Sequence, residues 1–251
     1  MMKHLVAIIV SVLLASCILV LGVLARGNSN QAGGGQQARS NASQAPFQAN
    51  GAFRAKAFMS GSYDGVNGTL EIADPVLRRP PPEFSASQVA IVFPQSQWIE
   101  AGWTKDAGID CNPWLYWATN PGWANRVAPA IIGRKYRFAI ALANQTYYLW
   151  RVRITDDNTN QVIFLKEDIT TSVRFTKGIQ IQANGEVGIT DTPDMGISGL
   201  LNLKYRLKPG PDWPFWDATS TRADNPYRIA AITMYSFQVS GNQGRYGFYC
   251  Q

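Results

Sequence analysis

The sequence predicts an all-β protein: an antiparallel β-sandwich of two packed sheets, preceded by an N-terminal hydrophobic leader. Beyond the leader, apolar residues come in short or alternating runs bounded by Gly, Pro, Asn and Asp, a pattern typical of sandwiches and barrels. No long stretch has the period of an amphipathic helix. About 200 residues follow the leader and its linker, enough for one β-rich domain with a substantial core.

Eleven segments have the length and residue pattern expected of β-strands. They cover residues 68–72, 87–93, 98–104, 114–119, 135–142, 147–156, 161–169, 176–183, 185–189, 200–207 and 230–239. This number of short strands suits two packed antiparallel sheets. The Pro- and Trp-rich stretch 209–216 is expected to be a long ordered loop, which either rims a cleft or packs on an open face of the sandwich.

The N-terminal residues 1–25 are expected to be a signal peptide or a membrane anchor, because residues 5–25 are almost unbroken apolar sequence. A third interpretation comes from Leu14-Ala15-Ser16-Cys17, which resembles a bacterial lipobox and would make Cys17 a lipidated N-terminus. All three predict an extracellular domain, secreted or anchored to the outer face of the membrane. Contact with the membrane is expected only through this segment.

The predicted domain boundaries follow a change in composition. Residues 26–54 are rich in Gly, Gln, Ser and Asn and contain too little apolar surface to offset the entropy of ordering them, so they are expected to be a flexible linker. Residues 55–251 form the predicted β-sandwich domain.

The cysteine and histidine content excludes several catalytic classes. Cys111 and Cys250 are the only cysteines beyond the leader, and an even number in an exported chain predicts a disulfide between them. The only histidine is His4, inside the leader. A Ser-His-Asp or Cys-His hydrolase and a His-ligated zinc site are therefore not expected. No cofactor fingerprint is present either, so neither a cofactor nor a metal is predicted.

The formal net charge of +6 is spread along the chain. Basic charge together with many aromatic residues is compatible with binding of nucleic acid or acidic glycans. Because Arg and Lys do not form a dense run, a soluble exported domain with a basic bias is the simpler interpretation, and no nucleic-acid partner is expected.

One expected strand places a carboxylate between an aromatic residue and a glycine. In the segment 98–104, alternation puts Trp98, Glu100 and Gly102 on one face. Across the two expected strands 176–183 and 185–189, alternation gives one wholly polar face, made of Gln180, Gln182, Asn184 and Glu186. Such a row could line a cleft, although a sheet with one solvated face gives the same alternation.

The five glutamates of the chain differ in their surroundings. Glu71, Glu83 and Glu167 lie beside turns, a proline-rich loop or a charged strand end, and are expected at the surface. Glu100 and Glu186 are embedded beside glycines and apolar residues, where burial can shift the pKa of a carboxyl group. These two are therefore the candidate catalytic residues.

Around these glutamates the sequence resembles the neprosin family of glutamic peptidases. The resemblance covers roughly residues 65–250, and its motifs are Pro82-Glu83-Phe84-Ser85-Ala86-Ser87-Gln88, Trp98-Ile99-Glu100-Ala101-Gly102-Trp103, Leu115-Tyr116-Trp117-Ala118-Thr119, Asn184-Gly185-Glu186-Val187 and Asp194-Met195-Gly196-Ile197-Ser198-Gly199. Two departures are Asn184, where the family has a first glycine, and Ile197, which interrupts the Met-Gly-Ser-Gly pattern.

The resemblance implies a catalytic β-sandwich whose two glutamates, Glu100 and Glu186, face each other on a concave surface. It also implies a peptidase that is active in acid and cleaves peptide or protein substrates after proline. Two close carboxyl groups cannot both ionise freely, so one would act as a base on water and the other as an acid. Trp98, Tyr116, Gln182 and Asn184 are expected to line the cleft or to supply an oxyanion donor.

Two other classes of function fit the same residues. A glycoside hydrolase also uses two carboxylates, and Trp98, Trp103 and Trp117 would suit sugar contacts if they were exposed. A non-catalytic extracellular module that binds carbohydrate or protein would use the aromatic residues without turnover. Cleavage of proline-rich peptides would separate the peptidase from both.

Overall fold

The structure, a computed structural model, describes residues 53–77, 83–106, 111–120, 124–188, 194–225 and 227–241. The predicted leader with Cys17, the linker up to residue 52, and Cys250 lie outside these ranges. Their assignments, and the pairing of Cys111 with Cys250, stay predictions. Within the described ranges no helix is both long enough and apolar enough to span a bilayer.

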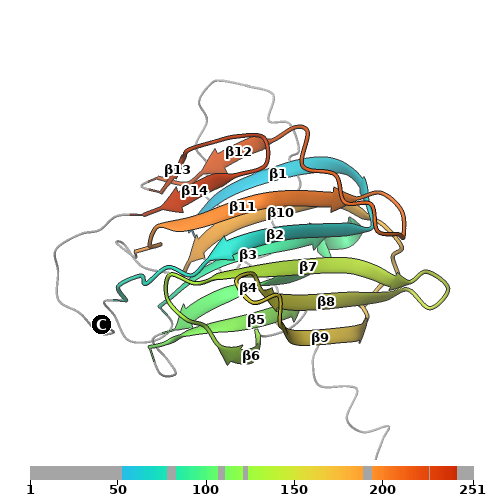
Figure 1. The fold of residues 1–251 in the computed structure, drawn as a ribbon. Coiled ribbons are helices and arrows are strands. Elements are labelled where there is room, and N and C mark those ends of the chain that lie inside the picture. The colour runs from blue at the N-terminus through green and yellow to red at the C-terminus, as the bar shows by residue number, and fades with distance from the viewer. Residues whose placement is uncertain are drawn as a thin grey trace, which may run out of the picture. The chain divides into compact units, whose positions relative to one another are not determined.

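Two antiparallel sheets of seven strands each form the domain, which confirms the predicted all-β sandwich (Figure 1). Sheet A contains, in spatial order, β12 (Ser220–Ala223), β1 (Phe53–Tyr63), β10 (Gly178–Val187), β3 (Phe84–Val92), β4 (Trp98–Asp106), β5 (Pro113–Thr119) and β6 (Asn125–Pro129). Sheet B contains β13 (Arg228–Ala230), β14 (Phe237–Ser240), β11 (Ser198–Arg206), β2 (Gly65–Glu71), β7 (Lys135–Asn144), β8 (Leu149–Asp156) and β9 (Val162–Ile169). A short 3-10 turn, Pro94–Ser96, connects β3 to β4.

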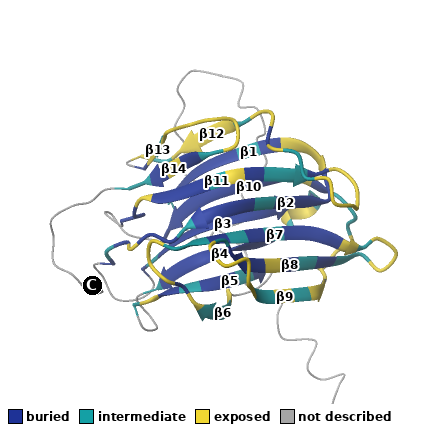
Figure 2. Ribbon diagram, viewed as in Figure 1, coloured by how far each residue is buried: buried dark blue, intermediate teal, exposed yellow. Residues whose placement is uncertain are grey.

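The hydrophobic core fills the space between the two sheets. Each central strand turns alternate residues inward, as the period of two requires. Sheet A contributes Ile99, Ala101 and Trp103 from β4 and Ile181, Ala183 and Val187 from β10 to this single cluster. Burial is concentrated in the central strands of both sheets, whereas β12 and β13 are exposed edges (Figure 2). Each fully buried Ile, Val or Phe contributes about 1.5–3 kcal/mol through removal of apolar surface from water.

The strand β10 differs from its prediction, because it is continuous where two strands with a break at Asn184 were expected. Gly185 lies inside the strand, opposite Ala55 and Ser87. A Cβ added there would lie 2.6 Å from Met195 Sδ. The glycine therefore admits the buried Met195 against the sheet, and this contact joins the two sequence motifs that contain these residues.

The strand β1 was not predicted, and it begins at Phe53, two residues before the predicted domain start. Its alternating pattern places Arg54, Lys56 and Phe58 on one face and Ala55 and Ala57 in the core. Small core residues gave this segment little apolar signal, and the polar residues extended the apparent linker into it.

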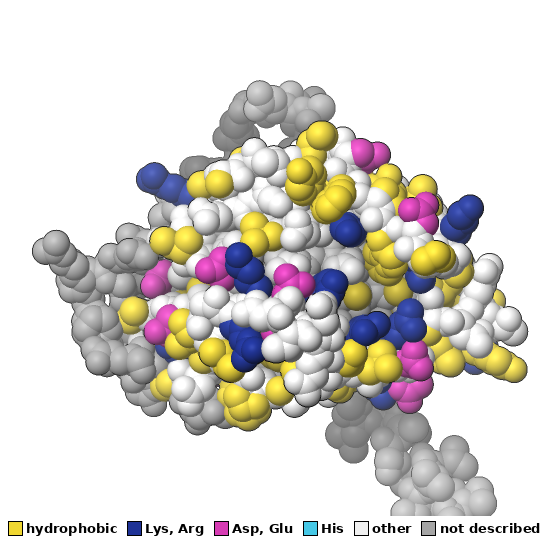
Figure 3. All heavy atoms as spheres, in the orientation of Figure 1, with side chains coloured by type: hydrophobic (Ala, Val, Ile, Leu, Met, Phe, Trp, Pro, Cys, Tyr) yellow, Lys and Arg dark blue, Asp and Glu magenta, His cyan; other side chains and the backbone are white. Residues whose placement is uncertain are grey.

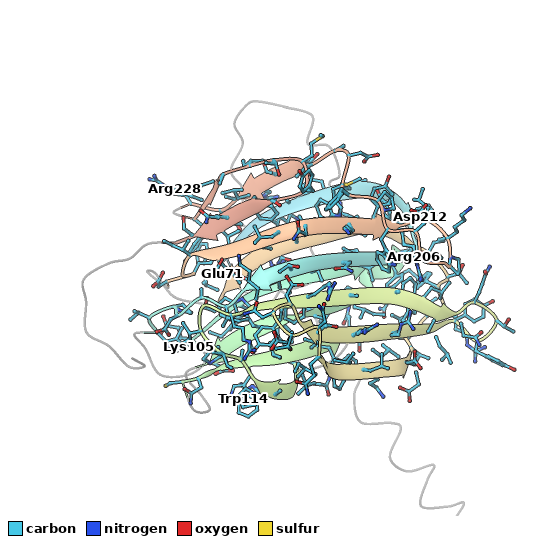
Figure 4. All side chains as sticks on the ribbon, viewed as in Figure 1. Glu71, Lys105, Trp114, Arg206, Asp212 and Arg228 are labelled. Carbon is cyan, nitrogen blue, oxygen red and sulfur yellow. The ribbon has the colours of Figure 1, made fainter. Side chains whose placement is uncertain are left out.

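The segment after β11 packs on sheet B. Trp213 contacts Gly65 closely enough that a Cβ there would lie 2.7 Å from its ring, and the same indole lies 5.2 Å from the Arg206 guanidinium. Arg206 and Asp212 lie together at one end of the sheets, away from Glu71 and Lys105 (Figure 4). Of the two positions expected for this loop, the structure therefore shows packing on a face of the sandwich.

Candidate active site

The order of strands in sheet A brings Glu100 and Glu186 to the same face. Strand β3 lies between β4 and β10 and pairs with both. Ala90 of β3 is opposite Glu100, and Ala86 of β3 is opposite Glu186. The two carboxylates therefore project from strands on either side of β3, separated by four residues along it.

Both glutamates lie on the face of sheet A that points away from sheet B, called here the outer face. Their neighbours in the strands, Ile99, Ala101 and Val187, point into the core, so alternation sends Glu100 and Glu186 the other way. Even so, Glu100 is only 3% exposed and Glu186 only 1%. These carboxyl groups are therefore held out of bulk water.

Glu186 accepts two hydrogen bonds from neighbouring strands. Arg54 Nη2 of β1 donates to Oε1 at 3.0 Å, and Gln88 Nε2 of β3 donates to Oε2 at 3.1 Å. The Arg54 contact is also a buried ion pair. Hydrogen bonds of this kind are charge-assisted and favour the ionised carboxylate.

Glu100 has a different kind of partner. Tyr116 of β5 donates its phenolic hydroxyl to Glu100 Oε1 at 3.1 Å. Burial raises the pKa of Tyr116 well above its ordinary value, and the charges of Glu100 and Glu186 add to this effect. The phenol therefore keeps its proton and remains a donor at every pH at which the protein would work.

The two carboxyl groups differ in their expected protonation. Burial, and secondly the charge of Glu186, raises the pKa of Glu100 to about 8. Burial also raises the pKa of Glu186, but the Arg54 guanidinium and the Gln88 amide oppose that rise. The ion pair with Arg54 thus makes Glu186 the more easily ionised of the two carboxyl groups, and burial makes Glu100 the one that keeps its proton to higher pH; this is the asymmetry that acid–base chemistry requires.

The other predicted cleft residues, Trp98, Gln182 and Asn184, also lie on the outer face. Trp98 is buried against Ala86, Tyr116 and Ala118, so it supports the site by packing. Gln182 is in the row of Glu100 and donates to Gln180.

The row between the two carboxylates carries amide groups. Asn184 is opposite Gln88, which is opposite Gly102, and Gly102 is opposite Tyr116. Within the described part of the chain, Asn184 Oδ1 and Gln88 Oε1 are buried acceptors without a hydrogen-bond partner. Buried polar groups are normally paired, so these two oxygens are candidate acceptors for a hydrogen bond from outside the described chain, and Gln88 also lines the pocket described next.

A pocket of about 130 Å³ lies between the carboxylates. Its lining consists of Phe84, Ala86, Gln88, Glu100, Thr104, Asp106, Tyr116, Ala124, Arg126 and Glu186. Arg126 and Asp106 form an ion pair of 3.2 Å in this lining. The pocket thus combines the two carboxyl groups with apolar side chains and with the ion pair of Arg126 and Asp106.

Two residues of the site, Arg54 and Gln88, were missed by the sequence analysis. Arg54 fell in the predicted linker, although the alternation of Arg54, Lys56 and Phe58 with alanines was a strand signal. Gln88 was part of a motif without a role. Glu83 was wrongly expected at the surface, since it is only 1% exposed, whereas Glu167 is exposed as expected.

Gly102 allows β3 and β4 to approach beside the carboxylates. A Cβ at this position would lie 2.0 Å from the Ser87 carbonyl oxygen and 2.7 Å from Gln88 Cα. Both are backbone atoms, which cannot move without shifting the strand. We therefore expect Gly102→Ala to lower the free energy of unfolding by about 1–3 kcal/mol or more and to displace Gln88 from Glu186.

Urea unfolding of Gly102→Ala and Gly199→Ala measures this effect. Gly199 is the matched control, because its added Cβ would meet nothing closer than 3.4 Å. Equal stability of the two variants would show that β3 adjusts to the methyl group at little cost.

A metal site is not apparent in the part of the chain described. No three His, Cys, Asp or Glu side chains of these residues come together in a way that could hold a metal ion.

Comparison with known proteins shows similarity in fold. No protein-family model matches the sequence, and no curated protein matches it. Two solved structures of scytalido-glutamic peptidase, with a peptide-based transition-state analogue and with a transition-state analogue inhibitor, superpose with TM-scores of 0.54 and 0.57 at 10% identity. SCP-B, a member of the eqolisin family of peptidases in complex with the tripeptide Ala-Ile-His, gives 0.53 at 10% identity.

In each case the match covers 76% of this chain and 98% of the other. Similarity at this identity establishes the fold and leaves the resemblance to neprosin unconfirmed. The chain therefore shares its sandwich with glutamic peptidases of the eqolisin type.

Proposed function

We propose that this protein is a glutamic endopeptidase that hydrolyses peptide bonds with Glu100 and Glu186. The observation that carries the proposal is the buried pair itself: one carboxyl bound by Arg54 and Gln88, the other by Tyr116. The fold adds support, because the similar structures are peptidases and one of them holds a tripeptide.

In this mechanism Glu186 is the general base and Glu100 the general acid. Glu186 takes a proton from water as the water oxygen bonds to the carbonyl carbon of the substrate. Glu100 polarises the carbonyl and then donates its proton to the departing amide nitrogen as the C–N bond breaks. A proton passes back from Glu186 to Glu100 to restore the starting state.

The amide row and Tyr116 support these steps by position. Asn184 is the better candidate for an oxyanion donor, because the Gln182 amide already donates to Gln180. Tyr116 orients the Glu100 carboxyl through its hydrogen bond.

Activity should depend on pH through two ionisations. Below the pKa of Glu186 both groups are protonated and no base remains; above the pKa of Glu100, about 8, both are ionised and no acid remains. The rate should therefore follow a bell whose alkaline limb reports the higher macroscopic pKa of the pair. The raised pKa of Glu186 moves the acidic limb upward, so the optimum is expected closer to neutral pH than the acid activity that the resemblance to the neprosin family implies. A rate that stays constant from pH 4 to pH 10 would exclude this assignment.

The finer features of the proposal concern substrate and location. Cleavage after proline is supported by the apolar side chains in the lining of the pocket, Phe84, Ala86 and Ala124, and by the sequence resemblance. Secretion or surface anchoring is supported by the apolar run of residues 5–25.

The test is hydrolysis of matched peptides that differ only by Pro or Ala before one bond. Purified protein is incubated with each from pH 2.5 to 10, and products are identified by mass spectrometry. Cleavage of the Pro peptide alone supports the full proposal, and cleavage of both supports a peptidase without proline preference. No cleavage of either, or of denatured protein substrates, by folded protein would overturn it.

A non-catalytic binding module is the second candidate. A groove of about 240 Å³ on sheet B is lined by Arg137, Arg151, Arg153 and Trp213 together with Asn67, Ala139, Ala141 and Thr155. Basic side chains are visible among acidic ones over this side of the molecule (Figure 3). Binding of acidic oligosaccharides without any hydrolysis would favour this candidate.

Sugar contacts through the expected tryptophans have less support. Trp103 lies in the core, Trp98 is only 3% exposed and Trp117 is partly buried against the core, so none of the three offers a fully open face to a sugar ring.

A further inference from the structure

Lys56 is a buried lysine on the outer face of sheet A. It is 8% exposed, and its ammonium group lies 5.3 Å from the centre of the Phe58 ring. Within the described chain the ammonium makes no hydrogen bond or ion pair, although lysine carries three donors. Lysines are rarely buried unless paired, because burial of an unpaired ammonium group lowers the stability of the folded protein. Such an arrangement is therefore a candidate for a functional role.

The acidic groups around Lys56 are already matched by arginines. Arg54 pairs with Glu186 at 3.0 Å, and Arg222 of β12 lies 3.6 Å from Asp224. The positive charge of Lys56 is therefore not balanced by a carboxylate of its own on this part of the outer face.

Titration of Lys56 is consistent with this imbalance. Burial, then the charges of Arg54 and Arg222, lowers its pKa to about 8, while Asp224 acts in the opposite direction. Glu186 is the remaining charged group on the adjoining strand. Below pH 8 the group is thus predominantly an ammonium ion that lacks a counter-ion.

The register places Lys56 next to the proposed catalytic pair. Lys56 is opposite Asn184 of β10, and its neighbour in β1, Arg54, is opposite Glu186. Lys56 is therefore a diagonal neighbour of Glu186, with their Cα atoms about 7–8 Å apart. An extended peptide advances about 3.3–3.6 Å per residue, so Lys56 lies within reach of a residue two or three positions from the cleaved bond.

We propose that Lys56 is a specificity residue that binds the carboxylate of an acidic side chain in the substrate. This inference rests on the proposed peptidase function and adds a substrate class to it: peptides with Asp or Glu near the cleaved bond, on the β1 side of the catalytic pair. The bound carboxylate would supply the missing counter-ion, and Asn184 beside it would face the peptide backbone.

The experiment compares peptides that differ only by Asp or Asn, scanned over the three positions on each side of the cleaved bond. The ratio of kcat/KM for Asp over Asn is measured at pH 5.5, where the peptide carboxylate is ionised. At one position we expect a ratio of about 10 to 100 for the unaltered protein. This is the effect on binding expected from one hydrogen bond between charged groups. The ratio should fall close to one in Lys56→Met and recover in Lys56→Arg.

Two controls define the source of the effect. Lys135→Met removes a lysine from sheet B and should leave the ratio unchanged. Peptides with an amidated C-terminus should give the same ratio as peptides with a free C-terminal acid, because the proposed ligand is a side chain. A preference confined to the free acids would overturn the proposal and would identify the terminal carboxylate as the ligand of Lys56. A ratio near one at all positions, or one that Lys56→Met does not alter, also overturns it.

Binding separates this inference from the proposed function. Titration calorimetry measures the binding of the same Asp and Asn peptides to the unaltered protein and to Lys56→Met. The measurement is made whether or not the peptides are found to be cleaved. If no peptide is cleaved but the Asp peptide binds more tightly through Lys56, the peptidase proposal fails and the carboxylate site stands. If peptides are cleaved without a Lys56-dependent preference, only the carboxylate site fails.

Discussion

Replacing either carboxyl group by its amide, in Glu100→Gln or Glu186→Gln, is expected to lower peptide hydrolysis by about 10³-fold or more. Each group has a separate task in the proposed reaction, and general acid–base catalysis contributes about 10²–10⁴-fold. An amide can neither take the proton of water nor donate one to the leaving nitrogen. Initial rates at the pH optimum, measured with one peptide at saturating concentration, give the factor for each variant.

The stability of the variants shows whether the loss is chemical. Burial raises the pKa of Glu100 from 4.5 to about 8 in the folded protein, so between these values the folded state binds more protons than the unfolded state. Stability from this group is therefore lost as pH rises through that range. Glu100→Gln should accordingly match the unaltered protein in Tm near pH 4 and exceed it near pH 8.

Glu186→Gln should behave differently, because it leaves the buried Arg54 guanidinium without a carboxylate. A lower Tm is expected for this variant at neutral pH. Substantial activity in either folded variant, within tenfold of the unaltered protein, would contradict the carboxyl-pair mechanism.

The polar face of the site was predictable because strands repeat every two residues. In β4 and β10 the alternation alone placed Glu100 and Glu186 on the face that points away from the core, while Ile99 and Ala183 point into it. The structure agrees. Such local periodicity does not depend on which strands are neighbours. The sequence could therefore predict which way each carboxylate points.

The partners of the carboxylates were harder to predict because they depend on strand order and register. Arg54 reaches Glu186 only because β1 pairs with β10, across 132 residues of chain. Gln88 reaches it only because β3 lies between β10 and β4. No local pattern encodes these long-range pairings.

Local composition is a poor guide to burial at two positions, for related reasons. Glu83 was assigned to the surface from the prolines before it, yet the fold buries it. Arg54 was assigned to the linker because the core residues next to it in β1, Ala55 and Ala57, are small. In both cases the neighbouring strands determine whether the residue is buried. The sequence of the residue's own segment gives little indication of that burial.

The largest loss of stability is expected from Arg206→Met, at about 3–5 kcal/mol. Arg206 Nε donates to Asp64 Oδ1 at 2.8 Å, and its Nη2 donates to the carbonyl oxygens of Asp64 and Leu142 at 3.2 and 2.7 Å. Asp64 is fully buried, so the variant leaves a carboxylate out of water with Lys177, 3.6 Å away, as its remaining cation. The loss is a large part of the 5–15 kcal/mol typical of a domain.

Urea unfolding of Arg206→Met and Arg151→Ala separates the effect of burial from that of pairing. Arg151 lies 3.0 Å from Glu167, a contact as short as many buried pairs, but the two side chains are 37% and 57% exposed. Its removal should cost about 0–1 kcal/mol, because water solvates the remaining charge. The double variant Asp64→Asn with Arg206→Met should lose less than the sum of the single variants, since no unpaired carboxylate remains. Equal losses for Arg206→Met and Arg151→Ala would mean that water reaches Asp64, and that the end of the sandwich around Arg206 opens readily.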